Sequence, residues 1–200
     1  MKIGCLARTL RARGAHDAVV GYWGERDLDW ATAVVAIAKA GSTYLPLDPS
    51  LPFRVHYHDR AESLRAGCWP GATEFDRPTP DEQQSTKFMA IEAALGEGQT
   101  PLLPLSSENG PAYILFTSGS TGQPKGAVIE RAALNNHLAA KIDALALTRT
   151  DCVAQTASHC FDISLWQLLA GLCVGGCVAI IDDTTLRSPV LSSKQFKVTA

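Results

Sequence analysis

The stretch that decides the fold is PAYILFTSGSTGQPKGAVIE, residues 111–130. Ala112–Phe116 is an apolar run typical of a buried strand, and Ala127–Ile129 is a second one. Between them, residues 117–126 contain three glycines, four hydroxyl side chains and one lysine. Glycines allow successive backbone N–H groups to point at one spot, and such an arrangement binds anions. The loop is therefore predicted to bind phosphate groups.

This loop differs from a Walker phosphate loop, which requires Gly-Lys followed by Ser or Thr at the start of a helix. Here Pro124 precedes Lys125 and Gly126 follows it, and the next residues are strand-like. The composition alone leaves a second interpretation open, a hairpin rich in glycine and serine that binds no ligand.

The segment before this stretch is expected to begin with a helix that Asp27 caps and Gly41 ends. An extended piece, Ser42–Leu45, follows, and two prolines exclude a helix from Pro46–Pro49. A further helix is expected at residues 51–65.

The amino-acid composition changes at residue 66. Residues 66–109 are expected to form a variable surface connection without a strand, in which only residues 88–95 look helical.

The segment after the stretch combines helices and strands. Leu134, Leu138, Ile142 and Leu145 recur at helical spacing, and Cys152–Thr156 is a strand candidate. Residues 163–181 carry no formal charge. Because two glycines divide this run, a buried helix followed by a strand at residues 177–181 is preferred to a membrane span. Strands that alternate with helices indicate an α/β fold of layered sheets flanked by helices.

The composition excludes several classes of protein. With 46% hydrophobic residues the 200-residue chain can build a packed core, and its net charge of −2 gives no basic footprint for a nucleic acid or an anionic membrane. The six cysteines show no CxxC spacing, and the amino-terminal apolar stretch is too short and too interrupted by arginine for a signal peptide. The cysteines are therefore expected to be small, reduced core residues of a cytoplasmic protein.

Three segments resemble a known family. Residues 117–126 fill every fixed position of the Thr-Ser-Gly-Ser/Thr-Thr-Gly-x-Pro-Lys-Gly signature of the adenylate-forming (AMP-binding) ligase superfamily. Residues 38–49 are similar to the Lys-Ala-Gly-x-x-Tyr-x-Pro-Leu-Asp-Pro segment of nonribosomal peptide synthetase adenylation domains. Residues 157–166 resemble the Phe-Asp-x-Ser segment that lines the amino-acid pocket of those domains. The resemblance implies the amino-terminal large subdomain of an adenylate-forming enzyme.

The resemblance also implies site residues. Asp162 would pair with the α-ammonium group of an amino acid, and Ile163 and Trp166 would line the pocket. The residues that would hold the phosphates of ATP are Thr117, Ser118, Gly119, Ser120, Thr121, Gly122, Lys125 and Gly126.

Structural alternatives stay open for the pocket residues. Asp162 and Ser164 would also serve as caps of a helix over residues 165–171, and Trp166 would also serve as core filler. His159 either touches substrate or is a satisfied core histidine. His56 and His58 with Asp59 are interpreted as a surface helix face rather than a metal site, and no metal ligand is assigned.

The implied reaction is that of an amino acid with ATP and Mg²⁺ to give aminoacyl-AMP and pyrophosphate, with a phosphopantetheine carrier domain as partner in a larger synthetase.

The chain shows no match to the family's later motifs, among them the one with the catalytic lysine, and residues 184–200 are atypical. The chain is therefore expected to be a partial adenylation domain over residues 1–200, with no catalytic residue of its own. The alternatives are a non-catalytic remnant that at most binds nucleotide weakly, and part of an acyl- or aryl-acid CoA ligase, against which Asp162 argues.

Overall fold

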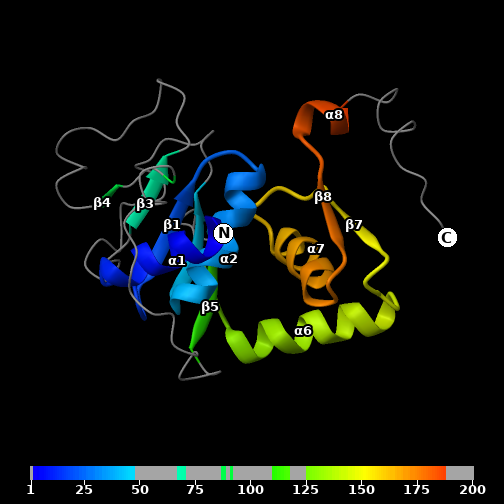
Figure 1. The fold of residues 1–200 in the computed structure, drawn as a ribbon, viewed down its shortest axis with the longest axis horizontal. Helices are drawn as coiled ribbons and strands as arrows, with labels where there is room; N and C mark the ends of the chain where they lie inside the picture. The colour runs from blue at the N-terminus through cyan, green and yellow to red at the C-terminus, as the bar shows by residue number, and fades with distance from the viewer. Residues whose placement is uncertain are drawn as a thin grey trace. The chain divides into compact units, whose positions relative to one another are not determined.

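The computed structural model describes residues 2–47, 67–70, 87–88, 91, 110–117 and 125–187 (Figure 1). These residues belong to two compact units, residues 1–135 and 136–200. Each unit is an arrangement of strands and helices, which confirms the α/β class and its layered sheets flanked by helices.

The first unit is built on a six-stranded sheet in the order β4-β3-β1-β2-β5-β6. All neighbouring strands are parallel except β5 and β6, which form an antiparallel hairpin. Helices α1 and α2 pack on each other, and α2 also packs on β1 and β2. The elements are α1 (Lys2–Ala12), β1 (Val19–Trp23), α2 (Leu28–Ala40), β2 (Thr43–Leu47), β3 (Gly67–Pro70), β4 (Lys87–Phe88), β5 (Pro111–Thr117) and β6 (Lys125–Glu130).

Helix α2 begins and ends where the sequence predicted. The Asp27 carboxylate accepts hydrogen bonds from the N–H groups of Asp29 and Trp30, each over 2.9 Å. At the other end Gly41 adopts φ 80°, a left-handed conformation that costs glycine little. The indole of Trp30 is fully buried and donates to the Tyr44 hydroxyl over 2.9 Å, so that α2 is fixed to β2.

The connection between β2 and β5 corrects one expectation. The sequence predicted no strand over residues 66–109, yet β3 pairs in parallel with β1 and β4 pairs with β3. Phe88, expected to start a helix, lies in β4. The residues after Pro70 are rich in glycine, proline and polar side chains, which suggested a surface connection, but pairing with a neighbouring strand overrides local preference. The helix expected at residues 51–65 lies outside the described residues.

The second unit centres on two parallel strands, β7 and β8, joined by helix α7. This arrangement confirms the predicted strand, helix and strand from residue 152 onward. Among the described residues, no helix is long and apolar enough to cross a membrane. Helix α6 begins in the first unit and continues into the second. The elements are α6 (Arg131–Ala144), β7 (Cys152–Gln155), α7 (Asp162–Cys173), β8 (Cys177–Ile180) and α8 (Asp183–Arg187).

The five cysteines whose side chains the structure describes are not buried in a core, contrary to the prediction. Cys152, Cys173 and Cys177 are exposed, Cys5 and Cys160 are partly exposed, and none of these five forms a disulfide. The error arose because the strands and helix that carry three of them begin or end at the surface of the second unit. The side chain of Cys68 lies outside the description.

Candidate functional site

The phosphate-loop candidate is held between two paired strands. The antiparallel register joins Phe116 to Gly126 and Thr117 to Lys125, so that the ladder continues up to the last residue on each side of the loop. The Thr117 hydroxyl donates to the Lys125 carbonyl over 3.4 Å. The two described strands therefore end at directly opposed positions, Thr117 and Lys125.

Gly126 packs closely against side chains of the paired strand in this hairpin. A Cβ at this position would lie 3.2 Å from Cγ2 of Ile114 and 3.4 Å from Cε1 of Phe116. Glycine thus allows β6 to pair closely with β5 beside the loop. The Lys125 side chain is exposed and can reach toward an anion.

The hairpin places its loop at a chemically useful edge of the sheet. Strand β5 runs parallel to β2, so the loop follows the carboxyl end of a parallel strand. In open α/β sheets, ligands bind beyond the carboxyl ends of the strands. Of the predicted phosphate-binding residues, the structure describes Thr117, Lys125 and Gly126. Ser118, Gly119, Ser120, Thr121 and Gly122 lie outside the described residues.

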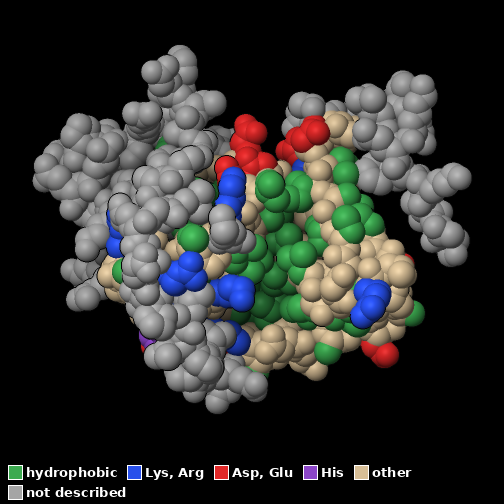
Figure 2. Space-filling model, in the orientation of Figure 1, with side chains coloured by type: hydrophobic (Ala, Val, Ile, Leu, Met, Phe, Trp, Pro, Cys, Tyr) green, Lys and Arg blue, Asp and Glu red, His purple; other side chains and the backbone are tan. Residues whose placement is uncertain are grey.

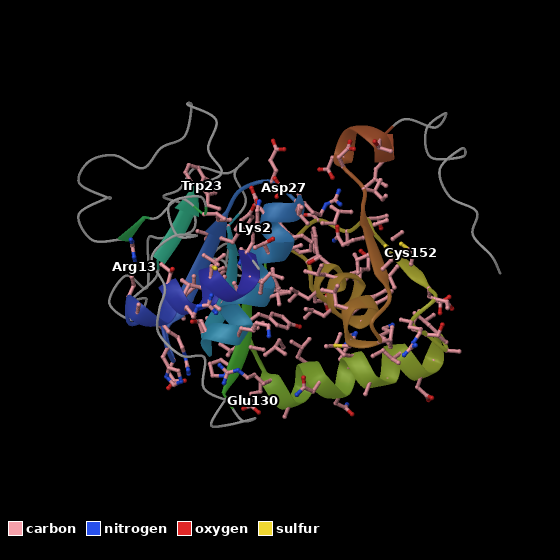
Figure 3. The ribbon with its side chains drawn as sticks, viewed as in Figure 1. Lys2, Arg13, Trp23, Asp27, Glu130 and Cys152 are labelled. Carbon is pink, nitrogen blue, oxygen red and sulfur yellow. The ribbon has the colours of Figure 1, made fainter. Side chains whose placement is uncertain are left out.

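Several acidic residues follow the carboxyl end of β1 in the same unit. Acidic side chains gather over the start of α2 (Figure 2), where Figure 3 labels Asp27. Burial, together with the charges of Asp27, Asp29 and Glu25, raises the pKa of Tyr22 far above its usual range. The phenol consequently stays protonated and donates to the Glu25 carbonyl over 2.9 Å. This contact fixes the β1–α2 turn.

The candidate amino-acid-binding residues lie together on helix α7 in the second unit. Asp162 is the first residue of the helix, and its Oδ1 accepts from the Ile163 N–H over 2.9 Å. Asp162 and Ile163 are exposed, with Ile163 exposed to 49%, and the neighbouring Phe161 is exposed to 64%. A carboxylate in the first helical turn is favoured by the helix dipole and remains available to a cation.

Helix α7 starts earlier than in the capping interpretation, which placed a helix over residues 165–171. Its N-cap residue is Phe161, which makes no side-chain capping bond, and the helix runs from Asp162 rather than from Leu165. Ser164 is fully buried and donates to the Phe161 carbonyl over 2.7 Å, so it stabilises the first turn without accepting from a helix N–H.

Gln167 is a positioning residue that the sequence analysis did not assign. Its Oε1 accepts from the N–H groups of Thr156 and Ala157, each over 3.0 Å, and its Nε2 donates to the Thr156 hydroxyl over 3.2 Å. These bonds fasten the segment that leads from β7 to Asp162 onto α7. The available signal was a glutamine among the otherwise apolar residues 165–173.

Trp166 is partly exposed, and its ring faces a cation. Nζ of Lys141 lies 5.3 Å from the ring centroid, within the range of a cation–π contact. His159, which the sequence left open, is 5% exposed. Among the residues that the structure describes, no group of three or more His, Cys, Asp or Glu side chains is placed to hold a metal ion.

Known proteins show which family the chain belongs to. The model of the AMP-binding enzyme family matches residues 2–200. The chain therefore belongs to the AMP-binding enzyme family.

Its relatives include nonribosomal peptide synthetases, and the chain resembles the adenylation domains of these enzymes within the family. The chain is 36% identical over 178 residues to tenellin synthetase of Beauveria bassiana (strain ARSEF 2860), covering 82% of this chain and 4% of that protein. It is 36% identical over 193 residues to the hybrid PKS-NRPS synthetase iliA of Neonectria sp. (strain DH2), covering 95% of this chain and 4% of that protein.

A solved structure supports the same fold. The nonribosomal peptide synthetase FmoA3 matches with a TM-score of 0.75 and 26% identity, covering 90% of this chain and 19% of that one. Its form with bound α-methyl-L-serine-AMP matches with a TM-score of 0.74 and 25% identity, covering 90% of this chain and 20% of that one. The fold is thus that of the amino-terminal part of an adenylation domain, and the chain spans a small share of each relative's length.

Proposed function

We propose that this chain serves the ATP-dependent activation of an amino-acid carboxylate as aminoacyl-AMP, as part of an adenylation domain of a nonribosomal peptide synthetase. The observation that carries the proposal is the complete phosphate-loop signature, residues 117–126, between two strands paired up to Thr117 and Lys125. In a synthetase, the activated amino acid would pass to a phosphopantetheine carrier domain.

The proposed role of the loop is to hold and orient the phosphates of ATP. The Lys125 ammonium supplies positive charge, and the hydroxyl and backbone N–H groups of residues 117–122 supply hydrogen-bond donors. Catalysis of this kind depends on positioning the two reactants and on neutralising phosphate charge. The substrate carboxylate would attack the α-phosphorus, with pyrophosphate as the leaving group.

The proposed role of Asp162 is to select an amino acid by its α-ammonium group. Its carboxylate is exposed at the start of α7 and lies beside the exposed side chains of Phe161 and Ile163. A charged group flanked by apolar side chains suits an ammonium group next to a substrate side chain. That FmoA3 has been solved with an amino-acid adenylate agrees with this substrate class.

Mg²⁺ fits the proposal as an ion brought by the nucleotide. Mg²⁺ is usually held by substrate phosphates with one or two protein carboxylates rather than by a cage of protein ligands. The described residues contain no such cage. When bound, the ion would neutralise phosphate charge alongside Lys125.

A binding experiment tests the nucleotide half of the proposal. ATP binding to the chain is measured by isothermal titration calorimetry with Mg²⁺, for the unchanged chain, for Lys125→Ala, and for Lys39→Ala as a control lysine exposed in α2. Loss of a charged hydrogen bond is worth about 1.5–3 kcal/mol, so Lys125→Ala is expected to weaken binding by roughly 10- to 100-fold. Equal affinity of the two variants would refute a phosphate-binding role for Lys125.

An exchange experiment tests the substrate half. Amino-acid-dependent ATP–pyrophosphate exchange is measured on the longest polypeptide that the gene encodes, with Asp162→Ala and with Asp183→Ala as a first-turn control in α8. Asp162→Ala is expected to raise the KM for the amino acid far more than that for ATP. Exchange that responds to aryl or fatty acids and not to amino acids would instead indicate a CoA-ligase type. ATP binding without exchange would indicate a non-catalytic remnant.

A further inference from the structure

Two cysteines face each other across neighbouring strands of the second unit. Cys152 and Cys177 are register partners at the first positions of β7 and β8. Both are exposed free thiols, and Figure 3 labels Cys152 on β7. Neither residue belongs to the phosphate loop or to the proposed amino-acid pocket.

The strand geometry brings the two thiols within reach of each other. Neighbouring strands lie about 4.8 Å apart, and a disulfide joins Cα atoms that are about 4.4–6.8 Å apart. The N–H of Cys177 also donates to the Asp151 carbonyl over 2.9 Å, which fastens the two strands together at this point.

The side chains of the pair are on the same face of the two strands. Cγ2 atoms of Val153 and Val178 both lie close to the position of a Cβ on Gly171, so these valines face helix α7. Because successive strand residues point to opposite faces, Cys152 and Cys177 point away from α7. A hydrogen bond with the Cys177 thiol raises the pKa of Cys152, as expected for thiols in contact.

We propose that Cys152 and Cys177 are a redox-active dithiol, which a small disulfide such as oxidised glutathione converts into a disulfide between β7 and β8. The thiolate of one cysteine attacks a glutathione sulfur, forms a mixed disulfide and releases one glutathione thiolate. The second cysteine loses its proton and attacks the protein-side sulfur, and the second glutathione leaves. Two protein thiols are oxidised to one disulfide, and one oxidised glutathione is reduced to two glutathione molecules.

The bond would close a loop that contains all of α7. A covalent link between residues 152 and 177 restricts the unfolded chain, and it is therefore expected to raise the melting temperature of the second unit. This inference does not depend on the proposed function, since it concerns residues outside both candidate sites.

Mass spectrometry of the whole chain tests the pairing. The chain is equilibrated in buffers with increasing ratios of oxidised to reduced glutathione, quenched in acid, and alkylated. No Lys or Arg lies between Arg149 and Arg187, so trypsin leaves four cysteines on one peptide. Cleavage before Asp162 instead separates Cys152 from Cys177, and a Cys160→Ser/Cys173→Ser background makes the assignment unique. The expected product is a linked pair of peptides, lighter than the two reduced peptides by two hydrogens.

The unchanged chain decides the question first, because it needs no variant to fold. In that chain, fragmentation of the linked peptides identifies the joined cysteines. Glutathione adducts on both cysteines without a link, a link from Cys152 to another cysteine, or links only between molecules would overturn the proposal. Cys152→Ser and Cys177→Ser are expected to abolish the link and leave a glutathione adduct on the remaining cysteine. A linked pair that persists in either variant would also overturn it.

Discussion

The chain contains two strand–helix–strand motifs of the same topology that differ in burial. Strands β1 and β2 are parallel neighbours joined by α2, and strands β7 and β8 are parallel neighbours joined by α7. Residues of β1 and β2 are almost all buried, whereas the first residues of β7 and β8 are exposed. Parallel strands are normally covered on both faces, and the first motif meets that expectation within a six-stranded sheet.

Helices α2 and α7 also differ in how their first turns are capped. Helix α2 has a side-chain cap on its first N–H groups, whereas the N-cap residue of α7 makes no side-chain capping bond. The first motif therefore uses its polar groups to stabilise the fold. The second leaves a carboxylate, Asp162, exposed at a helix start, and this is the motif that carries the candidate substrate-binding residues. The same topology thus supports a structural frame in one place and a candidate site in the other.

The largest expected effect tests the burial of α2. Ile37 is fully buried on this helix and Leu28 is 71% exposed on it. Ile37→Ala is expected to lower the free energy of unfolding by about 2–5 kcal/mol, because it removes buried methyl groups and leaves a cavity. Leu28→Ala is the matched control and should change it by less than about 0.5 kcal/mol. Urea unfolding measures both, and similar losses would contradict the assigned burial.

The next effect concerns how closely α7 packs on its strands. A Cβ on Gly171 would lie 3.0 Å from the Cys177 carbonyl oxygen and 3.0 Å from Cγ2 of Val178. Gly171→Ala is therefore expected to destabilise the protein by about 1–3 kcal/mol. Gly4→Ala in α1 meets only the flexible end of Arg8, at 3.4 Å, and should stabilise by about 0.5–1 kcal/mol. Thermal unfolding of both variants gives the comparison, and a stabilised Gly171→Ala would show that α7 packs less closely.

A smaller effect separates the two helix starts. Asp27→Ala removes both side-chain capping bonds of α2 and is expected to cost about 0.5–2 kcal/mol. Asp162→Ala removes one bond to the adjacent N–H and a favourable dipole interaction, expected at about 0.3–1 kcal/mol. Chemical denaturation of the two variants, side by side, measures the difference. If Asp162→Ala costs as much as Asp27→Ala, the main role of Asp162 is structural.

The smallest expected effect is a change in the pKa of Asp151, which lies just before β7. Asp151 accepts from the Thr148 hydroxyl over 2.8 Å and from the Thr148 N–H over 2.7 Å, and these bonds lower the pKa of its carboxyl. A group whose pKa is lowered by folding contributes stability above its unfolded pKa, and that contribution is lost as the pH falls through the folded pKa. Thr148→Val removes the hydroxyl and should raise this pKa toward its usual value. NMR titration follows the shift, and an unchanged pKa would disprove the hydroxyl's role.

The sequence predicted elements with strong local signals. Asp27 and Gly41 mark the ends of α2 by their own chemistry, and the paired strands around the phosphate loop were evident as two apolar runs. Strands β1 and β3 were missed because each is short and contains glycine or proline, and because their pairing comes from distant segments. Strand identity in such cases is set by tertiary contacts that local composition does not contain.

The candidate site was predicted by motif rather than by physical pattern. Composition alone left the loop at residues 117–126 as either a ligand site or a plain hairpin, and its resemblance to the family signature favoured the ligand site. Gln167 was missed because its role depends on where the chain after β7 passes, which the sequence does not state. The exposed cysteines were missed because hydrophobic character predicts burial only on average.

Gly41, which follows α2, accepts a hydrogen bond from a residue that is synthesised much later. Arg131 donates to the Gly41 carbonyl over 3.0 Å across 90 residues of sequence, and β2 pairs with β5 in the same region. During synthesis, the edge of β2 that pairs with β5 therefore stays unpaired until β5 has been made. An unpaired strand edge can associate with other chains. Expression that is slowed, or interrupted before residue 111, should accordingly yield aggregates rather than a soluble intermediate.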